Sequence, residues 1–144
     1  MMRNPGLARD YLRRAKLRLA ALDVLFEGES WADVVRESQE IVELSLKGLL
    51  RSCGIDPPRL HDVSVVLLAE RDRLPGALHC EAGWLANVSR QMRRDRELAF
   101  YGAEDLLPGD FYSCGDAETA RDQARRVVAL VYPCVCEPGN RYLA

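Results

Sequence analysis

The stretch Ser30–Gly54, SWADVVRESQEIVELSLKGLLRSCG, decides the fold. Its apolar residues recur at helical spacing, which gathers side chains on one face of a helix. Ser30 can cap the first turn, with Asp33 at the acidic position three residues further on. Gly54 can end the helix in the left-handed conformation. The stretch therefore predicts a long helix with a wide buried face, made of Trp31, Val34, Val35, Ile41, Val42, Leu46, Leu49 and Leu50.

The residues before this stretch predict a second long helix, over Pro5–Glu27. Their apolar positions alternate in steps of three and four, which makes one stripe. The stripe consists of Leu12, Ala15, Leu19, Leu22 and Phe26. Gly28 breaks the helix, and the short link to Ser30 indicates that the two helices pack as an antiparallel pair.

Further helices are predicted after the extended Pro57-Pro58 link. A shorter helix covers about Leu60–Arg73; its Val65–Leu68 run resembles a buried strand, but no partner strand is evident. The next helix begins near Pro75, a residue suited to a first turn, and runs to about Phe100 before Gly102. Its buried face is Leu78, Ala82, Leu85, Val88 and Met92.

A loop follows, and then a fifth helix that Asp116 can cap and Pro133 limits. Its buried face is Ala120, Ala124, Val127, Val128 and Val131. Together these segments predict an all-α, up-and-down bundle of four to five antiparallel helices. The 144 residues fit one domain, 1–144, with its core at about 8–131.

Composition and charge limit the classes of function that the chain can have. The net charge is −2, so the whole chain does not attract nucleic acid, but arginines cluster near Arg9–Arg18 and Arg90–Arg96. The odd count of five cysteines argues against a disulfide framework. No signal-peptide core or membrane-length apolar run is present in the sequence. We therefore expect a cytoplasmic protein with reduced thiols and no membrane contact.

Four segments in this order resemble the HEPN family (higher eukaryotes and prokaryotes nucleotide-binding). The first helix holds Ala8–Leu12, and the long second helix holds Gln39–Leu50, like the family's Glu-x-x-x-Lys-x-Leu-Leu helix. Glu43 and Lys47 are also spaced for a helical ion pair. Leu60–Val63 is similar to the family's His-Asp-hydrophobic start, and Arg94–Gly102 to its arginine segment. The resemblance covers about Ala8 to Val131.

The resemblance implies a four- or five-helix bundle, usually a homodimer in which the arginine segments of two subunits face a shared cleft. Many family members are metal-independent ribonucleases. Others partner minimal nucleotidyltransferases in toxin–antitoxin-like pairs, and some bind nucleotides without catalysis.

The ribonuclease signature of the family is an arginine, a polar residue, and a histidine after four to six intervening residues. Arg94 and Asp95 fit its first two positions, but positions 99–101 hold Ala, Phe and Tyr. The window counted from Arg96 contains no histidine either. Tyr101 is a poor base, because its reference pKa is about 10. Since general acid–base catalysis contributes about 10²–10⁴ in rate, we expect a degenerate motif and no efficient enzyme.

The arginine segment keeps other possible roles. Its guanidinium groups at Arg90, Arg93, Arg94 and Arg96 suit nucleotide or RNA phosphates. The alternative is a solvated face with helical ion pairs. By position, Tyr101 is a candidate for modification by a partner nucleotidyltransferase; the alternative is that Phe100 and Tyr101 pack as an aromatic pair at the end of the bundle.

The histidines and cysteines indicate structure rather than chemistry. His61 is expected to cap or orient the third helix. His79-Cys80 and Cys134-x-Cys136 lack a zinc spacing, so no metal and no cofactor are expected.

The resemblance, with the histidine missing from the motif, thus implies a nucleotide-binding or interaction module that forms a homodimer and partners a minimal nucleotidyltransferase. The alternatives are a metal-independent ribonuclease toxin with a non-histidine base, and a purely structural helical dimer.

Overall fold

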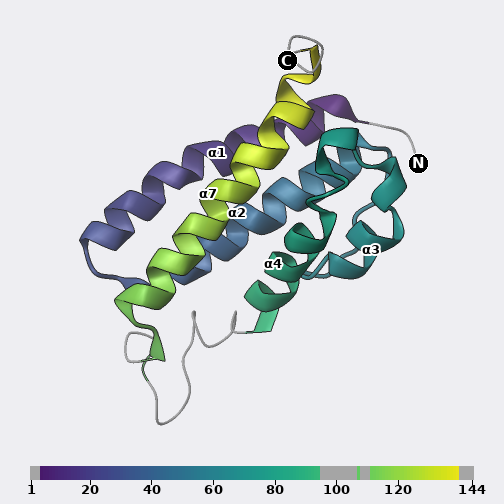
Figure 1. The fold of residues 1–144 in the computed structure, drawn as a ribbon. Helices are drawn as coiled ribbons and strands as arrows, with labels where there is room; N and C mark the ends of the chain where they lie inside the picture. Colours follow the sequence, from purple (N-terminus) through teal and green to yellow (C-terminus); the bar gives the residue numbers. More distant parts are fainter. Residues whose placement is uncertain (1–3, 95–106, 108–110, 140–144) are drawn as a thin grey trace.

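The computed structural model describes residues 4–94, 107 and 111–139, and every regular element in these ranges is helical. The elements are α1 (Pro5–Glu27), α2 (Trp31–Ser52), α3 (Ser64–Ala69), η1 (Arg71–Arg73), η2 (Gly76–Leu78), α4 (Ala82–Arg94) and α7 (Cys114–Cys136). Figure 1 shows α1 and α4 running in one direction and α2 and α7 in the other. The predicted all-α, up-and-down bundle is confirmed. None of the described helices has the length and apolar character that a bilayer crossing needs.

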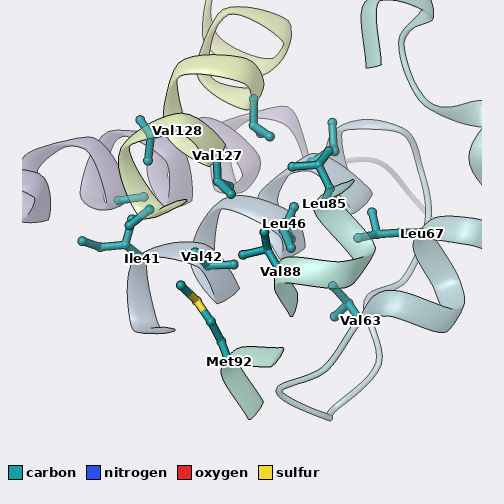
Figure 2. Close-up of a cluster of buried hydrophobic side chains, with 14 of the residues drawn as sticks. Ile41, Val42, Leu46, Val63, Leu67, Leu85, Val88, Met92, Val127 and Val128 are labelled. Atoms are coloured by element: carbon teal, nitrogen blue, oxygen red, sulfur yellow. The ribbon is translucent and has the colours of Figure 1, made fainter. Parts of the chain in front are cut away.

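Helix α2 is the centre of the bundle, because it contacts α1, α7 and α4. Its apolar face is buried as predicted, except that Trp31 is only partly covered. Figure 2 shows how side chains from α2, α4 and α7 meet in one cluster, with Leu46 and Val88 near its middle. Leu46 has 0% exposure, so the core runs continuously through the centre of α2. The two ends of the bundle are built on this shared core.

Gly48 lets α1 approach α2 closely. A Cβ atom at this position would collide with Leu12 Cδ2 and would lie 3.2 Å from Tyr11 Cβ and 3.3 Å from the Ala8 carbonyl oxygen. Two of these neighbours are on or beside the backbone of α1, which cannot swing away as a side-chain end can. A glycine inside a helix costs stability, and here it makes room for the packing of α1.

The predicted limits of the first two helices are confirmed, with one correction. Helix α2 ends at Ser52, and Gly54 follows in the left-handed region with φ 75°, as predicted. Ser30 occupies the N-cap position, but its hydroxyl donates to the Asp33 carboxylate at 2.6 Å instead of accepting from the backbone. The predicted side-chain cap is therefore wrong, since Asp33 competes for the hydroxyl.

The third helix is shorter than predicted. It begins at Ser64, because the Asp62 carboxylate accepts a hydrogen bond from the Ser64 backbone N–H at 2.8 Å and holds the preceding residues in a turn. The preference for helix over strand at Val65–Leu68 is confirmed. The chain then continues as the separate 3-10 turn η1.

Helix α4 begins later than predicted. Pro75 precedes the 3-10 turn η2, and α4 starts only at Ala82. The predicted buried face, Leu78, Ala82, Leu85, Val88 and Met92, is confirmed. The predicted extension from Arg94 to Phe100 lies outside the described residues.

The fifth predicted helix, α7, differs at both ends. Ser113 is its N-cap, and Asp116 completes a reciprocal capping box by accepting from the Ser113 backbone N–H at 2.9 Å. Pro133 lies inside the helix and does not end it. Its ring is exposed, while Cys134 and Val135 are buried and hold the last turn against the core.

Candidate functional site

A cleft of about 490 Å³ opens between α2, α4 and α7. Its lining residues come from the start of α2, the end of α4 and the start of α7, and these ends lie in the lower part of Figure 1. We call it the glutamine cleft, because the three glutamines of the chain, Gln39, Gln91 and Gln123, all line it. Three glutamines from three different helices converge here, although they are far apart in the sequence.

Gln39 is the most informative of the three. Its side chain is 5% exposed, and its Oε1 atom has no hydrogen-bond partner within the described part of the chain. A buried acceptor left without a partner costs about 1–3 kcal/mol. Most buried polar groups in proteins are satisfied, so such an exception needs a physical explanation. A ligand that donates a hydrogen bond from inside the cleft provides one.

Sequence reasoning missed Gln39, although a signal was present. Gln39 lies four residues after Val35 and three before Val42, both of which are buried, so it occupies the apolar face of α2. A polar residue at a buried helical position is the kind of departure from pattern that marks functional sites. Gln91 and Gln123 gave no such signal, because only the fold brings them together; the Gln123 Nε2 lies 3.5 Å from the Gln91 Oε1.

Apolar and aromatic groups form the rest of the cleft. Phe111 and Tyr112 stack edge to face, with ring centroids 4.7 Å apart, and Met92 lies beside them in the lining. Amide side chains recognise the hydrogen-bonding edges of heterocyclic bases, while aromatic and thioether groups cover their flat faces. The combination is therefore suited to a planar, polar-edged ring.

The arginine-bearing end of α4 adjoins this cleft. Gln91 and Met92 line it, and the next two residues, Arg93 and Arg94, form the last turn of α4, where only the backbone is described. Arg90 is exposed on the same helix. Asp95, Arg96, Tyr101 and the predicted Phe100–Tyr101 pair lie outside the described residues.

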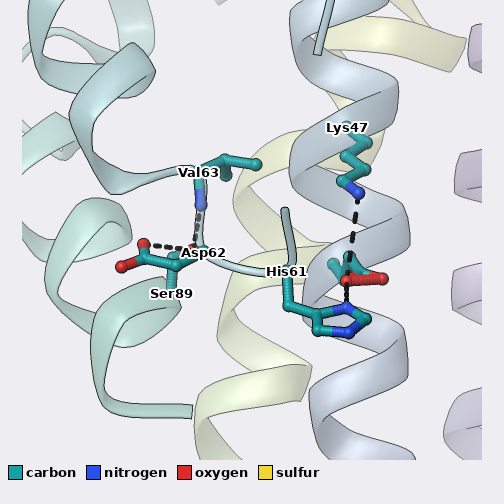
Figure 3. Close-up of polar contacts among 6 residues, drawn as sticks. Lys47, His61, Asp62, Val63 and Ser89 are labelled. Carbon is teal, nitrogen blue, oxygen red and sulfur yellow. Dashed lines mark hydrogen bonds and ion pairs between the residues drawn. The ribbon is translucent and has the colours of Figure 1, made fainter. Parts of the chain in front are cut away.

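Both histidines are engaged away from the glutamine cleft. Figure 3 shows the His61 Nδ1 atom bonded to a carboxylate, that of Glu43, which also pairs with Lys47 at 3.9 Å as predicted. His61 thus ties the turn before α3 to α2, whereas Asp62 closes the start of α3. The His79 Nε2 atom is 2.7 Å from the Leu74 carbonyl oxygen.

Asp62 organises the contact between α3 and α4. The Ser89 hydroxyl oxygen accepts a hydrogen bond from the Val63 backbone N–H at 2.9 Å, and the same hydroxyl donates to the Asp62 carboxylate at 3.3 Å (Figure 3). Burial acts to raise the pKa of Asp62, but the hydrogen bonds from Ser64 and Ser89 and the charge of Arg90 outweigh it, so the pKa is lowered. Among these lowering effects, the charge of the exposed Arg90 is the smallest.

None of the five cysteines, all of which lie in the described ranges, takes part in a disulfide. Burial raises the pKa of the Cys136 thiol, and the nearby charge of Arg13 only partly offsets this effect. A raised pKa keeps the thiol protonated and poorly reactive.

Comparison with known proteins decides the family. The sequence model of the HEPN domain matches residues 8–134. The chain belongs to the HEPN family. Its fold is also that of ST0689, an archaeal HEPN homologue known from a crystal structure, with a TM-score of 0.61 and 24% identity over 94% of this chain and 99% of that one. No curated protein matches the chain in sequence. The resemblance read from the four sequence motifs is therefore confirmed, and the HEPN match includes every residue that lines the glutamine cleft.

Proposed function

We propose that this HEPN protein is a nucleotide-binding interaction module whose glutamine cleft holds the base. The unpartnered, buried Oε1 atom of Gln39 carries the proposal. An amino group on the edge of a base, such as the N6 group of adenine, is a donor that would satisfy it. Gln91 and Gln123 supply further amide groups, and Phe111 supplies an aromatic edge or face.

The phosphates of the nucleotide would extend towards the end of α4. Arg93 and Arg94 directly follow the cleft residues Gln91 and Met92, and Arg96 follows two residues later in the sequence. Arginine is suited to phosphate because its planar fork donates two parallel hydrogen bonds. The assignment of Arg90, Arg93, Arg94 and Arg96 to phosphate binding is part of the proposal, with Arg90 the weakest member because its charge already acts on Asp62.

The proposed binding assay uses adenosine monophosphate and isothermal titration. Gln39→Met keeps the length and apolar packing of the side chain but removes the amide, so we expect about tenfold weaker binding, the equivalent of one good hydrogen bond. Asn87→Ala is the matched control, because Asn87 is an exposed amide on α4 outside the cleft lining. Equal affinities for wild type and Gln39→Met would refute the base-binding role.

The finer parts of the proposal concern assembly. By the family resemblance, the protein forms a cytoplasmic homodimer that places two arginine segments at one cleft, and it partners a minimal nucleotidyltransferase that modifies Tyr101. Light scattering at micromolar concentration tests the dimer. Co-expression with a small nucleotidyltransferase encoded beside this chain, followed by intact mass measurement of wild type and Tyr101→Phe, tests the partnership. Equal mass addition in both would exclude Tyr101 as the acceptor.

Ribonuclease activity is the less favoured alternative. The chain has no histidine after His79, so no arginine of the cluster is followed by the family's base. Metal-free cleavage of bulk RNA that Arg94→Ala and Arg96→Ala both abolish would favour this alternative over the binding module.

A further inference from the structure

A second pocket lies at the opposite end of the bundle from the glutamine cleft. It has a volume of about 430 Å³ and is enclosed by the beginning of α1, the carboxyl ends of α2 and α7, and η1. Figure 1 shows these segments together at the end of the bundle where α1 begins and α7 ends. Arg9, Arg51 and Arg73 line it, and among the described residues no carboxylate does. We call it the arginine pocket.

The three arginines are not equally engaged. The Arg73 guanidinium donates to the Cys53 and Gly54 carbonyl oxygens at 3.3 and 3.2 Å and pairs with Glu70 at 3.3 Å, so it caps the carboxyl end of α2. Capping accounts for Arg73. It does not account for Arg9 or Arg51, which make no ion pair and no side-chain hydrogen bond with any described residue.

Arg51 is the stronger sign of a missing partner. Its Nε atom is buried without a hydrogen-bond acceptor, and its guanidinium lies 5.7 Å from the centre of the Tyr11 ring, a contact that balances little of its charge. Two positive charges facing one pocket repel each other, so the arrangement is expected to attract an anion. The carboxyl ends of α2 and α7 place partial negative charge beside the pocket, roughly half an elementary charge for each helix, and the Arg73 guanidinium already balances part of it at α2.

Size and lining narrow the class of anion. The volume lies within the range of about 300–1,000 Å³ usual for small-molecule sites, which is more than inorganic phosphate needs. Pro5, Pro75 and Val135 give the pocket an apolar part of its wall. Arginine pairs prefer planar, bidentate recognition of phosphate oxygens.

We propose that the arginine pocket binds a small organic phosphate, with Arg9 and Arg51 holding the phosphate and the proline-rich wall covering the organic part. The arginine pocket is separate from the glutamine cleft, and this proposal does not depend on the function proposed for that cleft. Phosphate binding in this pocket also gives a role to Arg9 in the basic cluster of α1, which the proposed nucleotide site near Arg94 does not use.

The test is a titration of the full chain with phenyl phosphate, followed by the arginine Nε–Hε resonances in nuclear magnetic resonance spectra. We expect the Arg9 and Arg51 signals to shift, and Arg9→Ala to weaken binding about tenfold, as the loss of one charge-assisted hydrogen bond predicts. Arg14→Ala is the matched control, because Arg14 lies on α1 outside the pocket and pairs with Asp10. Its affinity should change less than about twofold.

Further arms separate the possible sources of binding. Phenol should not bind, and inorganic phosphate should bind more weakly than phenyl phosphate. Arg51→Lys keeps the charge and should still weaken binding, because it loses the bidentate fork. Equal weakening by Arg9→Ala and Arg14→Ala, equal affinity for inorganic and phenyl phosphate, or no shift at Arg9 and Arg51 would each overturn the proposal. Gln39→Met should leave phenyl phosphate binding unchanged, whether or not the glutamine cleft binds nucleotide.

Discussion

The two ends of the bundle are built on the same helix but differ in chemistry. Gln39 and Arg51 are twelve residues apart on α2, which places them about 18 Å from each other along the helix axis. The glutamine cleft presents neutral amides and an unpartnered oxygen, whereas the arginine pocket presents unpaired positive charge. A central helix can therefore contribute to two chemically independent sites, provided that the core between the sites holds the helix in place.

The largest effect is expected from a cavity in that shared core. Leu46 is fully buried between the two ends, so Leu46→Ala should destabilise the protein by about 2–5 kcal/mol and weaken both sites. Urea unfolding measures the loss, and Leu17→Ala, at a position 77% exposed, is the control. A loss below about 1 kcal/mol would mean that the ends do not share this core.

Gly48→Ala should affect the arginine pocket and leave the glutamine cleft unchanged. The added Cβ would press on Leu12, Tyr11 and Ala8, and Ala8 lines the arginine pocket. We expect a destabilisation of about 1–3 kcal/mol from overpacking, with weaker phenyl phosphate binding and unchanged nucleotide binding.

Gly83→Ala is the control for this substitution, since its added Cβ would meet no atom within 4 Å apart from the neighbouring backbone of its own helix. It should leave stability unchanged or raise it by up to about 1 kcal/mol through helix propensity. Thermal unfolding of both variants checks the contrast, and a Gly48→Ala protein as stable as Gly83→Ala would contradict the close packing of α1 on α2.

Asp62→Asn should have the smallest effect on the free energy of unfolding and should change binding at neither site. The lowered pKa of Asp62 means that its contribution to stability is present above the ordinary value of 3.8 and is lost as the pH falls through the lower folded-state value. We expect a loss of less than about 1 kcal/mol at neutral pH, because the amide oxygen can still accept from Ser64. Unfolding at pH 7 and pH 3 should show the difference between wild type and variant shrinking with acid; a growing difference would reverse the assigned sign.

Local sequence patterns were sufficient for the parts of the fold that depend on one helix at a time. The stripe of α1 and the face of α2 predicted both helices because burial imposes helical spacing on their apolar residues. The predicted helix end was wrong where contacts outside the apolar pattern determine where the helix begins or ends. Asp62 shortens α3 by a turn that no apolar period reveals, and Pro133 remains inside α7 because the residues after it are buried.

The candidate sites were less predictable than the fold. The arginines near Arg94 were found from the family motif, but Gln91 and Gln123 join Gln39 only after three helices pack together. Arg9, Arg51 and Arg73 likewise come from three separate segments. Convergence of distant residues is a property of packing, so a single sequence shows at most a local anomaly such as Gln39 on an apolar face.

Thermal unfolding of wild type and Gln39→Met, each with and without adenosine monophosphate, tests the central claim most directly. Without nucleotide, the variant should be more stable by about 1 kcal/mol, because it removes a buried acceptor that has no partner. With nucleotide, wild type should gain more stability than the variant, since only wild type satisfies the acceptor on binding. A Gln39→Met protein that is less stable when free, or one that nucleotide stabilises as much as wild type, would contradict the account.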